Sequence, residues 1–134
     1  MLSIFPSLLI FGIFAPFILR VVVGAYLLHI GWGHLTTQRE TLVEKLYARL
    51  GSPTTIFIVF GGLFEVVLGL FLIAGFLTQV MALLGGLYAL KLLWFKKEFP
   101  VLVPHERIFY ILLFAIFLSL LLTGAGAPAV DLPL

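Results

Sequence analysis

Cysteine is absent from this chain, and charged residues make up only 10% of it. The absence of cysteine excludes disulfides, thiol relays and metal sites built from thiolates. A soluble domain carries about a quarter charged residues, so the scarcity of charge argues against a soluble protein. With 63% hydrophobic residues in 134, the sequence predicts one small integral membrane domain, residues 1–134, whose first partner is the lipid bilayer.

Several function classes lack their sequence signals. The net charge of +2 is too small to indicate a nucleic-acid partner. No P-loop, dinucleotide fingerprint, Ser-His-Asp set or c-type haem motif is present. The three histidines are not clustered along the sequence, so no metal site is predicted. The N-terminus lacks a basic region and a cleavage site, so we expect no removable signal peptide.

Apolar segments of membrane-spanning length recur along the sequence. Pro16 and Pro53 favour helix starts, because proline suits the first turn, where its missing N–H is not needed. Thr78-Gln79 leaves room for only a short turn, so the flanking helices are predicted to be antiparallel neighbours. The fold class predicted is all-α, an integral membrane antiparallel four-helix bundle. Its predicted spans are residues 15–35, 54–77, 80–95 and 107–123.

The connection after the first span predicts a short amphipathic interfacial helix. Leu42, Leu46 and Leu50 repeat every fourth residue, with charged residues around the rest of the helix. Lysine and arginine gather in the connections after the first and third spans. The positive-inside rule therefore places these loops in the cytoplasm and both termini outside a plasma (inner) membrane. The basic residues concerned are Arg39, Lys45, Arg49, Lys96, Lys97 and Arg107.

Glu65 is the only charge in residues 54–77. An uncompensated acid at mid-bilayer costs roughly 2.5–3.5 kcal/mol on insertion scales, so it is expected to be paired or functional. Gly61 and Gly69 share its helix stripe, which favours contact with another helix. Arg20 is predicted to lie within one or two helical turns of the depth of Glu65 in the membrane. Its long side chain can bridge that difference, so we predict an Arg20–Glu65 pair. This pair either fixes the helix register or holds a polar cavity for a ligand or a proton path; the remaining alternative is that the two residues do not pair.

Other residues extend this prediction. His29 points away from the face of Arg20, and it either packs against another helix or contacts a ligand. Lys91 lies one turn from the end of the third span, and it either reaches the interface or points inward toward Glu65. Small residues are predicted to let the helices approach closely. These packing positions are Gly24, Gly31, Gly61, Gly62 and Gly69.

Two motifs suggest a family. The first motif is Arg20-x-x-x-Gly24 followed by His29-Ile30-Gly31-Trp32-Gly33-His34-Leu35. The second is Gly62-Leu63-Phe64-Glu65-Val66-Val67-Leu68-Gly69-Leu70, and it continues to Gly75-Phe76-Leu77-Thr78. Together with Thr123-Gly124-Ala125-Gly126 and Asp131, they resemble the DoxX family. The resemblance implies a four-helix membrane protein in which Arg20, Gly24, Gly62, Glu65 and Gly69 occupy typical family positions. Family members often carry lysine where this chain has His34.

The resemblance supports three hypotheses of function. Relatives include a subunit of thiosulfate:quinone oxidoreductase and a membrane partner of superoxide dismutase and a sulfurtransferase. The first hypothesis is therefore a small subunit of a quinone-linked or oxidative-stress redox system, with quinone as ligand and with the redox centre in another protein subunit. The second is a non-catalytic scaffold that binds partners through residues 38–50. The third is transport or lipid binding in the same pocket, which would need a homo-oligomer.

Overall fold

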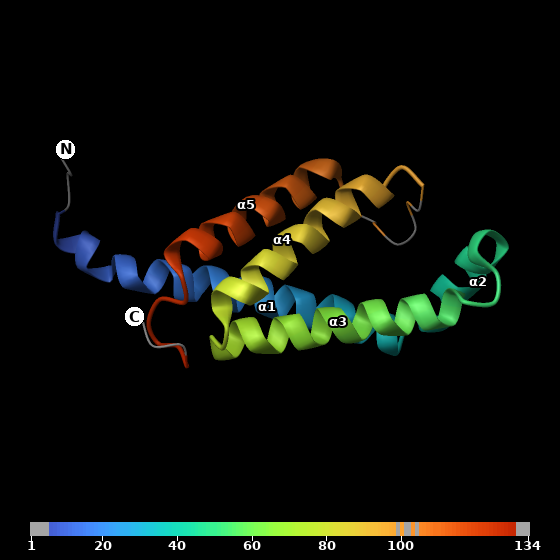
Figure 1. Ribbon diagram of the computed structural model, residues 1–134, viewed down its shortest axis with the longest axis horizontal. Helices are drawn as coiled ribbons and strands as arrows, with labels where there is room; N and C mark the ends of the chain where they lie inside the picture. Colours follow the sequence, from blue (N-terminus) through green and yellow to red (C-terminus); the bar gives the residue numbers. More distant parts are fainter. Residues whose placement is uncertain (1–5, 99, 101–102, 104, 131–134) are drawn as a thin grey trace.

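The structure is a computed structural model that describes residues 6–98, 100, 103 and 105–130. Within these residues every regular element is a helix. In chain order they are η1 (Pro6–Ile13, a 3-10 helix), α1 (Phe14–Leu35), α2 (Arg39–Leu50), α3 (Thr54–Ala74), α4 (Thr78–Phe95) and α5 (Arg107–Thr123) (Figure 1). Three helical segments are long and apolar enough to cross a membrane, namely Ile10–Leu35, α3 and α4. The apolar helix α5 is shorter, at 17 residues.

The helices pack as two antiparallel pairs, α1 with α3 and α4 with α5 (Figure 1). Packing within each pair is far more extensive than packing between the pairs. Glycine makes the α1–α3 approach possible. An added Cβ at Gly31 would lie 2.7 Å from the Gly62 carbonyl oxygen, and one at Gly69 would lie 2.7 Å from the Gly24 carbonyl oxygen. The two helix backbones are therefore in direct contact at both levels.

Gly61 was predicted as a packing position, and the structure shows that this prediction is wrong. An added Cβ there would meet no described atom within 4 Å. The face of α3 that meets α1 runs through Gly62, Glu65 and Gly69, at spacings of three and four. The predicted stripe used a spacing of four throughout, which drifts around the helix and so adds Gly61. Gly62, which was also predicted, does lie on the contacting face.

The turn between α3 and α4 lies earlier than the sequence predicted. Gly75 ends α3 in the left-handed conformation at φ 69°, and the Phe76 N–H donates to the Phe71 carbonyl oxygen at 3.0 Å. This is the glycine-terminated helix end that satisfies the last carbonyl groups. Thr78 and Gln79, predicted as the turn, instead form the first turn of α4.

The helix α2 packs on the first turns of α3. Leu42 and Leu46 are buried against Ile58, so α2 lies beyond the end of α1 (Figure 1). The end of α1 consequently meets the middle of α3, where an added Cβ at Gly62 would lie 3.1 Å from His34 Cβ. α3 thus extends about two turns past α1, and this stagger decides which polar residues share a level.

Candidate functional site

Arg20 and Glu65 lie at different levels, so the predicted pair is wrong. The Arg20 guanidinium lies against Gly75, at the far end of α3. Glu65 is level with Gly31, because an added Cβ at Gly31 would lie 2.8 Å from Glu65 Cβ. Residues 65 and 75 are about 15 Å apart along a helix. The prediction failed because it did not include the stagger between α1 and α3, which their glycine contacts show.

Arg20 instead binds the segment that follows α5, residues 124–130, which we call the tail. Its side chain is only 1% exposed. Nη1 donates to the Ala125 carbonyl oxygen at 2.7 Å, and Nη2 donates to the Pro128 carbonyl oxygen. The Val130 N–H adds a bond to the Ala74 carbonyl oxygen at 3.3 Å. The buried cation therefore holds the tail across the end of the α1–α3 pair.

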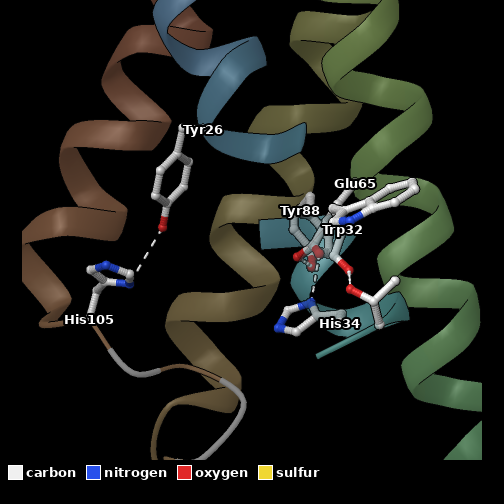
Figure 2. A network of polar contacts seen from close by, with 7 residues as sticks. Tyr26, Trp32, His34, Glu65, Tyr88 and His105 are labelled. Atoms are coloured by element: carbon white, nitrogen blue, oxygen red, sulfur yellow. Dashed lines mark hydrogen bonds and ion pairs between the residues drawn. The ribbon is translucent and has the colours of Figure 1, made fainter. Parts of the chain in front are cut away.

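Glu65 is the centre of a cluster that joins three helices (Figure 2). Its side chain is 3% exposed. His34 Nδ1, on α1, lies 2.7 Å from Glu65 Oε2, and the Tyr88 hydroxyl, on α4, donates to Oε1. Both carboxylate oxygens thus have partners, which offsets the cost of placing an acid among apolar helices. We call Glu65, His34 and Tyr88 the acid pole.

A second polar contact lies near the start of α5 (Figure 2). The Tyr26 hydroxyl, on α1, is 3.4 Å from His105 Nδ1. The His105 ring stacks on Phe109 with ring centroids 4.5 Å apart, and Lys96 Nζ donates to the His105 carbonyl oxygen. We call Tyr26 and His105 the imidazole pole.

Both poles line one cavity of about 330 Å³. This volume lies at the lower end of the range for small-molecule sites, about 300–1,000 Å³. Leu27, Leu92 and Leu113 supply apolar wall, and the exposed residues Trp32 and Gln38 lie at its edge. All three histidines and three of the four tyrosines of the chain line it. These residues are His29, His34, His105, Tyr26, Tyr88 and Tyr110.

The four residues predicted for a polar pocket divide into two groups. Glu65 and His29 line the cavity, and His29 does so from its exposed edge. Among the described residues, the cavity lining does not include Arg20 or Lys91. Lys91 is exposed on α4, and its Nζ lies 5.5 Å from the centroid of the Phe95 ring. Of the two predicted orientations, it therefore takes the outward one.

Sequence reasoning missed five histidine and tyrosine residues of the cavity. His34 carried one usable signal, because it shares a helix face with Gly24 and Gly31. Its partner Glu65 was assigned to Arg20 instead. The other four come from α1, α4 and the start of α5, and no local pattern marks them. They are Tyr26, Tyr88, His105 and Tyr110. Within the described residues, no three His, Asp or Glu side chains are grouped so that they could hold a metal ion.

Tyr88→Phe is expected to lower the free energy of unfolding by about 1.5–3 kcal/mol, because it removes a hydrogen bond to a buried charged acceptor and leaves that acceptor unsatisfied. Equilibrium unfolding in mixed detergent micelles measures the change. Tyr47→Phe is the matched control, since Tyr47 is exposed on α2 and lies outside the cavity lining. Equal stability of the two variants would contradict the assigned Tyr88–Glu65 bond.

These features define a class of protein: a helical membrane protein with a hydrogen-bonded acid buried between its apolar helices. The DoxX family model matches residues 15–97, more than half of the chain, so the chain belongs to the DoxX family. α2, α3, α4, the acid pole and all of α1 except its first residue lie inside this match. The resemblance in Thr123–Gly126 and at Asp131 lies beyond it, and Asp131 is also outside the described residues. No curated protein and no solved structure matches the chain.

Proposed function

We propose that this protein is a small subunit of a membrane redox system and that its cavity binds the headgroup of a quinone. The observation that carries the proposal is the buried Glu65 carboxylate, bonded to His34 and Tyr88 at the wall of a cavity of about 330 Å³. A quinone takes up protons when it is reduced and releases them when it is oxidised. Carboxyl and imidazole groups are the usual carriers of such protons in proteins.

The lining of the cavity fits a flat ring with polar edges. Leu27, Leu92 and Leu113 offer apolar surface to the ring faces. His34 and Tyr88 would hold a ring oxygen, as hydrogen-bond donors able to turn from Glu65 to the ligand. Glu65 would accept a proton from a hydroxyl group or hold one ready for a carbonyl group.

A partner subunit is part of this proposal, because electrons must reach the cavity from another protein. The absence of cysteine excludes an iron–sulfur cluster bound by thiolates of this chain. The partner, a membrane or peripheral protein, would therefore carry the redox centre.

We further propose that α1, α3, α4 and α5 form an antiparallel four-helix bundle in the plasma membrane, with α2 at the interface. The exposed Trp32 and Trp94 lie in the last turns of α1 and α4 and suit an interfacial anchor. Basic residues gather at this end, so it would be cytoplasmic and both termini outside. A reporter fused after Leu134 is then active only outside the cytoplasm, and activity only inside would contradict this orientation.

Gentle purification from native membranes, followed by mass spectrometry of lipids and proteins, tests the proposed function. Wild-type protein is expected to retain near-stoichiometric quinone, and Glu65→Gln is expected to lose most of it. Glu44→Gln is the control, because Glu44 is exposed on α2 and should not affect the cavity. Wild-type protein with no more quinone than an unrelated membrane protein would contradict the proposal.

A scaffold is the second candidate, and α2 is the observation that favours it. Its apolar residues Leu42 and Leu46 are buried on α3, while Arg39, Glu44 and Lys45 are exposed. Such a charged face is available to a peripheral protein. The same purification separates the two candidates: a scaffold would retain partner proteins without quinone, and Glu65→Gln would leave those partners bound.

A further inference from the structure

We propose that the cavity takes a ligand with an oxygen atom at each end of a flat ring, held at one end by the acid pole and at the other by the imidazole pole. This inference rests on the proposed function and names the class of ligand more narrowly. It assigns His105 and Tyr26 as specificity-determining residues. Figure 2 shows the two poles on different sides of the view, and both line the same cavity.

The imidazole pole is available to a ligand because its internal bond is weak. Tyr26 and His105 are 3.4 Å apart, whereas His34 and Glu65 are 2.7 Å apart. A hydroxyl-to-nitrogen distance of 3.4 Å is beyond the usual range of hydrogen bonds. Tyr26 and His105 therefore lose little when they turn to a ligand oxygen, and they gain a shorter bond.

His105 is held in place by contacts that do not need its ring nitrogens. Its ring stacks on Phe109 at an interplanar angle of 25° and meets Tyr110 edge-on with centroids 6.3 Å apart. Lys96 binds its backbone carbonyl oxygen, which any residue would offer. A phenylalanine would satisfy all of these contacts. The imidazole is thus positioned in advance on the wall of the cavity, and its Nδ1 makes only the long contact with Tyr26 among the described residues.

Each pole contains residues from both helix pairs. In the acid pole Tyr88 on α4 bonds Glu65 on α3, and in the imidazole pole Tyr26 on α1 lies beside His105, which precedes α5. A ligand that reaches both poles would therefore be held by polar groups of both pairs, between which packing is otherwise sparse. A ring with one oxygen would satisfy one pole and leave the other without a partner. Sites built to bind two polar groups reject analogues that lack one of them.

The test uses a matched pair of ligands. Wild-type protein in phosphatidylcholine nanodiscs is titrated anaerobically, by calorimetry, with a decyl-substituted hydroquinone and with the phenol that lacks one of its hydroxyl groups. The hydroquinone is expected to bind about three- to tenfold more tightly, the effect of one net hydrogen bond. In His105→Phe this difference is expected to shrink, because the stacking on Phe109 is kept and the nitrogen atoms are lost, which leaves only Tyr26 in the imidazole pole. His105→Gln is expected to restore part of the difference.

Each outcome decides a different point. Equal affinity of wild type for the two ligands, or an unchanged difference in affinity in His105→Phe, overturns the role of the imidazole pole. Neither result contradicts the proposed quinone site. Binding of neither ligand to wild type overturns the proposed function itself. Tyr26→Phe repeats the test without altering the connection before α5. A reduced difference in affinity in Tyr26→Phe supports the role of the imidazole pole even when His105→Phe fails to fold. An unchanged difference in affinity overturns that role.

Discussion

Removal of residues 125–134 is expected to destabilise the protein by about 3–5 kcal/mol, the effect of leaving a buried charge without its compensating partners. Arg20 is 1% exposed, and its guanidinium donates to the carbonyl oxygens of Ala125 and Pro128. Truncation removes both acceptors while the cation stays between the ends of α1 and α3. Equilibrium unfolding of the full-length and truncated chains in mixed detergent micelles measures the loss.

A second variant shows whether the charge is the cause. Arg20→Met replaces the guanidinium with an apolar side chain, so the truncated chain that carries it is expected to be more stable than the truncated chain alone. The four proteins form a double-mutant cycle whose coupling free energy reports the Arg20–tail interaction. Equal stability of the truncated and full-length chains would contradict the assigned role of Arg20.

Gly69→Ala is expected to destabilise the protein by about 1–3 kcal/mol, the usual effect of forcing an extra carbon into a packed interface. The added Cβ would lie 2.7 Å from the Gly24 carbonyl oxygen, which belongs to the backbone of α1 and moves only with the whole helix. The two helices must then separate, and the residues of the acid pole, one of which is on α1, separate with them. The free energy of unfolding is the quantity to measure.

Gly61→Ala on the same helix provides the matched control. An added Cβ at Gly61 would meet no described atom within 4 Å, so this variant is expected to keep wild-type stability or gain up to about 1 kcal/mol from better helix propensity. Loss of stability in Gly61→Ala equal to that in Gly69→Ala would show that the α1–α3 contact does not use the described face.

Much of the helix pattern follows from local sequence. The apolar stretches mark α1, α3 and α4, and the spacing of Leu42 and Leu46 marks the buried face of α2. Glu65 was predicted as a buried polar residue because a single charge in a long apolar run needs a partner. These inferences succeed because each depends on residues within a few turns of each other.

The partners of the buried charges did not follow from sequence, for two physical reasons. Helix register depends on tertiary packing, and the packing of α1 on α3 places Arg20 about 15 Å from the level of Glu65. Within the part of the chain that the structure describes, two acceptors of Arg20 are backbone carbonyl groups, which every residue carries and which therefore leave no mark in the sequence. Tyr88 and His105 likewise reach the cavity only through the packing of α4 and α5.

Photolabelling with an azidoquinone in native membranes tests whether a quinone binds in the cavity, because it maps where the quinone lies on the protein. Peptide mass spectrometry is expected to place the label within residues 26–38 and 105–113, the segments of α1 and α5 that line the cavity. Excess unlabelled decylquinone should prevent this labelling, and Glu65→Gln should reduce it. Labelling confined to the outer faces of α3 and α4, and unchanged by excess quinone, would contradict a quinone site in the cavity.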